Sequence, residues 1–158
     1  MNRKWTVRFA VALATVVLVA CGNGDDGTAA GNGTTVQVAL QEWAIVPDTA
    51  SASAGEVTFE IENTGDETHE FVILRTDLDI LDLPTAEDGS VDEEGDAGIE
   101  VVDEVEDLAS GASEALTVDL ESGNYALICN IVEEEMDMEM EHDPSHFQNG
   151  MRTSFTVE

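Results

Sequence analysis

The chain has 158 residues, which is enough for one domain of ordinary size plus a processing segment. Its 35 acidic residues against five basic ones give a formal net charge of −30. Nucleic acids and anionic lipid surfaces are polyanions, so this charge argues against both as partners.

The first twenty residues have the layout of a secretory signal. Arg3, Lys4 and Arg8 form a positive start, and residues 9–19 form an apolar stretch of eleven residues. A helix that spans a bilayer needs about 20 apolar residues, so this stretch is too short for one. We therefore expect residues 1–20 to be removed, which leaves two basic residues against 35 acidic ones and a formal charge of −33.

The signal ends in Leu18-Val19-Ala20-Cys21, which resembles the bacterial lipobox. The resemblance implies that Cys21 is lipidated and anchors the chain to a membrane outside the cytoplasm, because two acyl chains give stable attachment. The alternatives are a plain cleavage site or a weak membrane anchor with an incidental cysteine. Cys129 is then the one cysteine left in the body, either a buried small side chain or a functional thiol.

Residues 21–35 are rich in Gly, Asn, Asp and Thr, and we expect a flexible tether that precedes a domain at 36–158. Alternating apolar and polar residues between turn signals predict about seven short strands. These lie at 36–40, 43–46, 56–62, 70–74, 114–120, 125–130 and 152–158. The near-continuous apolar run at 70–74 predicts either burial on both faces or a position against the other sheet. The fold class is therefore all-β, a Greek-key sandwich of two antiparallel sheets.

Residues 76–107 form an acidic excursion from this core. Ile99, Val102 and Val105 follow helical spacing, so we expect one short amphipathic helix at 98–109. The run lacks the spacing of an EF-hand calcium loop, and a solvated loop is the favoured interpretation of its acidity.

Four residues with metal-binding side chains lie at strand ends or in the loop before the final strand. They are His69, Cys129, His146 and Met151. Two His and one Cys with a weak axial Met form the ligand set of a blue-copper electron-transfer centre. Each residue alone has an ordinary structural interpretation, as a hydrogen-bonded histidine or a core side chain. The hypothesis depends on the ordered set.

His69, the run Gly123-Asn124-Tyr125 leading to Cys129-Asn130, and His146 followed after four residues by Met151 resemble the cupredoxin family, particularly its plastocyanin and halocyanin type. The resemblance covers about 36–158 and implies that the four residues bind one type 1 copper ion. It also implies a monomeric electron carrier rather than an enzyme, with redox partners such as a cytochrome or a membrane oxidoreductase.

The chain departs from the simple family pattern between two of these residues. Sixteen residues separate Cys129 from His146, where simple members have far fewer. Going from about 4 to 16 residues costs only about 1.2 kcal/mol of closure entropy, so the insertion is tolerable. It leaves the solvent shielding of the site open and supplies a rival ligand in His142. His146 is preferred because its gap to Met151 matches the family.

The insertion also contains a run of soft ligands between carboxylates: Met136, Met138, Met140 and His142. Thioethers suit Cu(I), so the run predicts either a second, exposed copper-loading site or a mobile loop with incidental methionines. The first option supports an alternative function, copper binding and delivery. A third hypothesis is a metal-free sandwich used as a structural module.

The acidity of the whole chain has two interpretations. One is docking on a basic redox partner, which electrostatic steering would accelerate at low salt. The other is adaptation to a salty milieu, where carboxylates are screened and hydrated. Acidic residues are spread over nearly the whole chain, which favours the second.

Overall fold

The computed structural model describes residues 33–93, 98–133 and 144–158. The expected signal, Cys21, and the methionines and His142 of the insertion lie outside these residues. The described elements are β1 (Thr34–Gln41), β2 (Ala44–Pro47), β3 (Ser51–Ala52), β4 (Gly55–Asn63), β5 (His69–Thr76), β6 (Ile99–Leu108), β7 (Ser113–Leu120), β8 (Gly123–Ile128), α1 (His146–Asn149) and β9 (Arg152–Val157).

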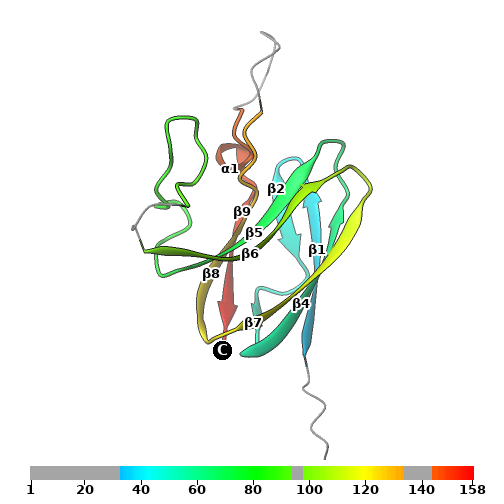
Figure 1. The fold of residues 1–158 in the computed structure, drawn as a ribbon, viewed down its shortest axis with the longest axis vertical. Helices are drawn as coiled ribbons and strands as arrows, with labels where there is room; N and C mark the ends of the chain where they lie inside the picture. The colour runs from blue at the N-terminus through cyan, green and yellow to red at the C-terminus, as the bar shows by residue number, and fades with distance from the viewer. Residues whose placement is uncertain (1–32, 94–97, 134–143) are drawn as a thin grey trace, which may run out of the picture.

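The strands form two sheets that pack face to face, with α1 at one end (Figure 1). The strand orders are β2-β1-β4-β7 and β3-β9-β8-β5-β6. The predicted all-β sandwich is therefore confirmed, but the sheets are mixed rather than wholly antiparallel. The pairs β1–β4 and β3–β9 run parallel, and in each pair other strands separate the two members along the chain.

The predicted helix at 98–109 is wrong, because this segment is the edge strand β6. Its pairing with β5 shifts register twice, between His69 and Phe71 and between Ile73 and Leu74. At each shift β6 carries one extra residue, so its inward side chains recur every third residue rather than every second. Val105 and Leu108 are buried in this way, and Asp107 between them has a positive φ of 51°.

The main core fills the space between the sheets. Phe59 of β4 contacts Phe71 of β5 and Phe155 of β9, with ring centroids 5.4 and 5.6 Å apart. All three rings are buried, and burial of such a side chain stabilises a fold by roughly 1.5–3 kcal/mol. Cys129 and Met151 belong to the same apolar cluster.

A second, smaller apolar cluster covers the outer face of the five-stranded sheet. Val72 and Leu74 of β5 pack there against Leu83 and Val91 of the acidic excursion and Phe147 of α1. Residues 71–74 are all fully buried, which confirms the predicted burial of this strand on both faces. The excursion is therefore a cover for one sheet, and it fixes α1 as well.

No described helix has the length and apolar character that a membrane span requires.

Candidate metal centre

His69, Cys129 and His146 converge beside α1, of which His146 is the first residue. Nδ1 of His69 lies 3.2 Å from Nδ1 of His146, and Sγ of Cys129 lies 3.3 Å from the same His146 atom. The exposed fractions of His69, Cys129 and His146 are 0%, 0% and 1%. The three side chains thus form a closed cluster of nitrogen and sulfur donors.

Strand pairing explains how His69 and Cys129 meet. β5 and β8 are antiparallel neighbours, with Val72 opposite Ile128, so the start of β5 lies beside the end of β8. His69 is the first residue of β5, and Cys129 directly follows β8. The backbone N–H of Glu70 donates a hydrogen bond to Cys129 Sγ over 3.3 Å, which fixes the sulfur against β5.

Backbone hydrogen bonds join the two ends of the sixteen-residue segment between Cys129 and His146. Residues 131–133 and 144–146 run side by side: His146 N donates to Ile131 O over 3.0 Å, and Glu133 N donates to Pro144 O over 2.9 Å. An antiparallel bridge between Val132 and Ser145 lies between these bonds. The insertion therefore leaves from and returns to one short ladder, and His146 arrives beside Cys129 as it would after a short loop.

Met151 is brought back to the same cluster by α1. This single turn ends at Gly150, where φ is 125° and a Cβ would lie 3.1 Å from Trp43 O, so the position favours glycine on both counts. Met151 follows, fully buried, and its carbonyl accepts a hydrogen bond from Cys129 N over 3.0 Å. The structure thus places all four predicted site residues in one region.

The donor set fits a small metal ion. First-row metal ions bind imidazole nitrogen at about 2.0 Å and thiolate sulfur at about 2.3 Å, which places neighbouring ligand atoms about 3.3 to 3.8 Å apart. The Nδ1–Nδ1 distance of 3.2 Å lies just below that range and the Sγ–Nδ1 distance of 3.3 Å at its lower limit, so a slight outward displacement of the side chains admits an ion. Burial raises the pKa of the Cys129 thiol to about 11, so metal binding must displace a proton from sulfur.

Carboxylates surround the two histidines on the side away from the sulfur. Glu42 Oε1 lies 2.9 Å from His69 Nε2. Glu67 Oε2 and Glu133 Oε1 lie 3.7 and 3.6 Å from His146 Nε2. Burial and the facing Glu133 raise the pKa of Glu67. The site is therefore anionic, which favours a bound cation.

Trp43 covers the histidines from the turn between β1 and β2. Its ring meets that of His146 edge-on at 4.9 Å between centroids, and that of His69 at 6.5 Å. This cover, together with Glu67 and Glu133, answers the question of solvent shielding that the insertion raised, since His146 is buried despite it.

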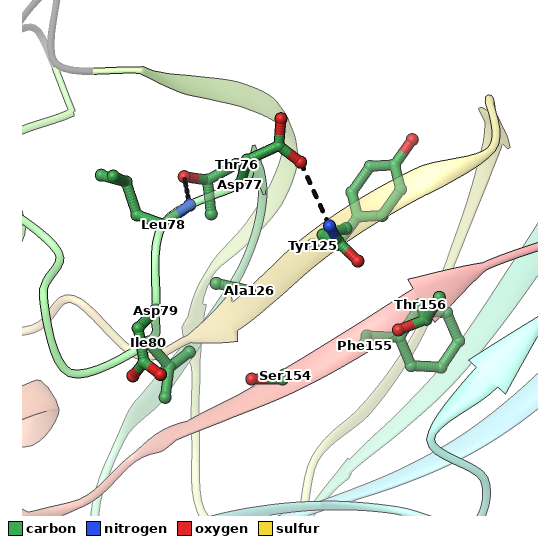
Figure 2. A pocket seen from close by; sticks show the side chains of 11 residues that line it. Thr76, Asp77, Leu78, Asp79, Ile80, Tyr125, Ala126, Ser154, Phe155 and Thr156 are labelled. Atoms are coloured by element: carbon green, nitrogen blue, oxygen red, sulfur yellow. Dashed lines mark hydrogen bonds between the residues drawn. The ribbon is translucent and has the colours of Figure 1, made fainter.

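A surface pocket of about 360 Å³ lies elsewhere, and Figure 2 shows the side chains that line it. It includes Asn124 and Tyr125 at the start of β8, whereas Cys129 follows the end of that strand. Asn124 donates to Asp77 over 3.1 Å, and Leu78 N donates to Thr76 Oγ1 over 3.1 Å, so these polar groups satisfy one another. The pocket contains none of the clustered donors.

Sequence reasoning missed the residues around the donors. No sequence pattern around these residues marks them as part of a site, since three of the four are glutamates in a very acidic chain. The residues are Glu42, Trp43, Glu67 and Glu133. Only their positions in space connect them to the site.

A model of the cupredoxin-like domain family matches residues 9–140. The match includes His69 and Cys129 but ends before His146 and Met151, which the structure brings to the cluster. No curated protein matches the chain significantly.

Solved structures similar to this fold include two auracyanins and a rusticyanin. A dithionite-reduced auracyanin from the photosynthetic bacterium Roseiflexus castenholzii is 21% identical with a TM-score of 0.53, over 81% of this chain and 99% of that chain. Auracyanin A, a "blue" copper protein from Chloroflexus aurantiacus, is 17% identical with a TM-score of 0.49, over 80% and 99%. Rusticyanin from Thiobacillus ferrooxidans is 17% identical with a TM-score of 0.47, over 81% and 79%. The likeness to the Roseiflexus protein shows a shared fold.

Proposed function

The chain belongs to the cupredoxin-like domain family, and we propose that it is a type 1 copper protein that carries single electrons between redox partners. The observation that carries the proposal is the convergence of two imidazole Nδ1 atoms and one thiol sulfur in a buried cluster, 3.2 and 3.3 Å apart. Soft thiolate and imidazole together suit copper in both of its oxidation states.

The four residues have separate roles in this proposal. His69, Cys129 and His146 would hold the ion as its three strong ligands, and Met151 would be a fourth, weaker ligand. Copper supplies the chemistry of accepting and releasing one electron. Because the ligands stand at strand ends and on a capped turn, the protein holds one geometry for both oxidation states. The N–H of Glu70 supports this by stabilising negative charge on the sulfur of Cys129.

The same proposal includes the location of the protein. The Leu18-Val19-Ala20-Cys21 ending supports lipidation at Cys21 and extracytoplasmic attachment to the cell membrane, on its periplasmic or outer face. Residues 21–35 would then give the domain reach from that surface, although the structure begins β1 at Thr34. A carrier tethered in this way meets partners in or on the same membrane, such as a cytochrome or an oxidoreductase.

The test is a visible absorption spectrum of the full chain after addition of Cu(II) and an oxidant. We expect an intense thiolate-to-copper band that reductant bleaches and that Cys129→Ser abolishes. Cys21→Ser, which leaves the buried cluster intact, is the matched cysteine control and should keep the band. Copper binding without the band would favour the delivery function, and absence of binding would overturn both.

A further inference from the structure

Glu42 touches the imidazole of His69 on the side opposite the donor cluster. Its Oε1 lies 2.9 Å from Nε2 of His69, a residue with 0% exposed side chain. The carboxylate itself keeps 26% exposure. An ionised carboxylate can only accept hydrogen bonds, so this contact requires the proton of His69 to be on Nε2. Nδ1 of the same ring then presents a lone pair toward Cys129 and His146.

The turn that follows β4 holds this carboxylate in place. The N–H of Asp66 donates to Oε1 over 3.0 Å and to Oε2 over 3.2 Å, and the N–H of Glu67 donates to Oε1 over 3.0 Å. Gly65 makes room for it, because a Cβ at that position would lie 2.8 Å from Cδ of Glu42. Partial burial acts to raise the pKa of Glu42, but these N–H groups and His69 outweigh it, so the pKa lies below its ordinary value.

We propose that Glu42 is a positioning residue for the copper centre. Glu42 selects the Nε2–H tautomer of His69 and lowers the reduction potential of the copper centre. The inference rests on the proposed function. A carboxylate that accepts from the far nitrogen of a ligating histidine orients the ring and makes its other nitrogen a stronger donor. Negative charge close to the site also favours the more positive oxidation state of the ion.

The contact of Glu42 is shorter than those of the other carboxylates at the site. Glu133 and Glu67 stand 3.6 and 3.7 Å from Nε2 of His146, beyond hydrogen-bond distance. Glu42 lies 2.9 Å from Nε2 of His69 and accepts its proton directly. The charge of Glu42 should therefore change the reduction potential and the Cu(II) affinity of the centre more than an equal charge that makes no such contact.

The test compares the reduction potentials and Cu(II) affinities of three variants of the full chain. Glu42→Gln removes the charge and keeps the shape. Asp66→Asn removes one charge from the same turn, where the side chain is exposed. Gly65→Ala displaces the carboxylate without changing the charge. We expect Glu42→Gln to weaken Cu(II) binding about 10- to 100-fold and to raise the potential. Gly65→Ala should change both in the same direction, and Asp66→Asn should change them much less.

Equal effects of Glu42→Gln and Asp66→Asn would overturn the proposal, since unspecific charge would then explain both. A second measurement separates this failure from that of the proposed function. Nitrogen-15 NMR of the metal-free protein should show His69 protonated at Nε2, and the Nδ1–H form should gain population in Glu42→Gln. An Nδ1–H tautomer in the unaltered protein would overturn the role of Glu42 even if the copper band is present. A correct tautomer without a copper band would instead overturn the proposed function, and would leave only the selection of the His69 tautomer by Glu42 standing.

Discussion

At the scale of single residues, Asn63 shows how a buried amide prepares the site. The side chain is fully buried at the end of β4. Its Nδ2 donates to Glu67 O over 2.7 Å and to Leu108 O over 2.8 Å, and its Oδ1 accepts from Gly65 N over 3.0 Å. These bonds shape the turn that cradles Glu42 and delivers His69 to β5. The turn itself was predictable from Asn63-Thr64-Gly65, whereas the role of the amide was not.

Replacement of Asn63 by alanine should destabilise the protein and loosen the metal centre together. Each buried carbonyl left without its donor costs about 1 to 3 kcal/mol of unfolding free energy. Urea denaturation of the metal-free protein should show this loss, and Cu(II) affinity should fall as well. Asn124→Ala is the matched control, because among the described residues the amide of this exposed side chain donates to Asp77 alone. An Asn63→Ala variant as stable as that control would contradict the role given to this residue.

Met151 offers a separate test of the ligand assignment. Leucine has a similar volume, so Met151→Leu in this buried position should cost less than about 1.5 kcal/mol of stability. It would remove the thioether proposed as the weak ligand and leave the three proposed strong ligands in place. We therefore expect the intense absorption band to persist and the reduction potential to rise, as measured by voltammetry. An unchanged potential would mean that Met151 only packs.

At the scale of elements, alternation predicted the strands well and their partners poorly. The segments around residues 38, 59, 72, 117, 127 and 155 are strands as expected. The parallel pairing of β1 with β4 left no trace in the sequence, because it depends on the path of the connection rather than on the strand. In β6, the two register shifts each add one residue relative to β5, so buried side chains recur every third residue instead of every second. This spacing resembles that of a helix.

The candidate site was predictable only as far as its side chains are chemically distinctive. His69, Cys129, His146 and Met151 are rare residue types in this chain, and their order marked them. Glu42 is one of 35 acidic residues, so its selection required the turn at 63–67. The ladder of residues 131–133 with 144–146 was also beyond the sequence pattern, because it consists of backbone hydrogen bonds.

The acidic excursion is joined to the metal centre by a hydrogen bond between Glu93 and Asn130, the residue after Cys129, and the charge of Glu93 depends on pH. Burial raises the pKa of Glu93, and the charge of Glu104 acts in the same direction. The hydrogen bond that Glu93 Oε1 accepts from Asn130 Nδ2 over 2.8 Å lowers the pKa but does not outweigh them. A carboxyl whose folded pKa is raised contributes stability below its unfolded pKa, and this contribution is lost as pH rises through the folded pKa.

Glu93→Gln should therefore stabilise the metal-free protein at pH 7, because glutamine keeps the oxygen that accepts from Asn130 and carries no charge. For a partly exposed group we expect about 0.2 to 1 kcal/mol. The gain should disappear near pH 4, where the glutamate is protonated in the folded and unfolded states. Thermal unfolding at the two pH values measures it. Glu60→Gln changes an exposed position of the other sheet, so its effect on stability should differ less between the two pH values. A difference equal to that of Glu93→Gln would contradict the burial argument.

At the scale of the whole molecule, like charges oppose the compact state. The 35 acidic residues repel one another across a small domain, and β6 places Glu100, Asp103, Glu104 and Glu106 in exposed positions on a sheet edge. Charge on an edge strand prevents pairing with a second copy, so this density favours solubility while it costs stability.

Added salt should therefore raise both the unfolding free energy and the reduction potential. The Debye length falls from about 30 Å at 0.01 M to about 3 Å at 1 M, so repulsion between carboxylates fades across that range. The same screening weakens the preference of the negative protein for the oxidised ion. NaCl titrations followed by thermal unfolding and by voltammetry measure the two slopes. Amide replacement of the four β6 carboxylates should stabilise the protein at low salt and flatten both slopes. Slopes that stay as steep in this variant would show that salt acts through bound ions or general solvent effects rather than through screening.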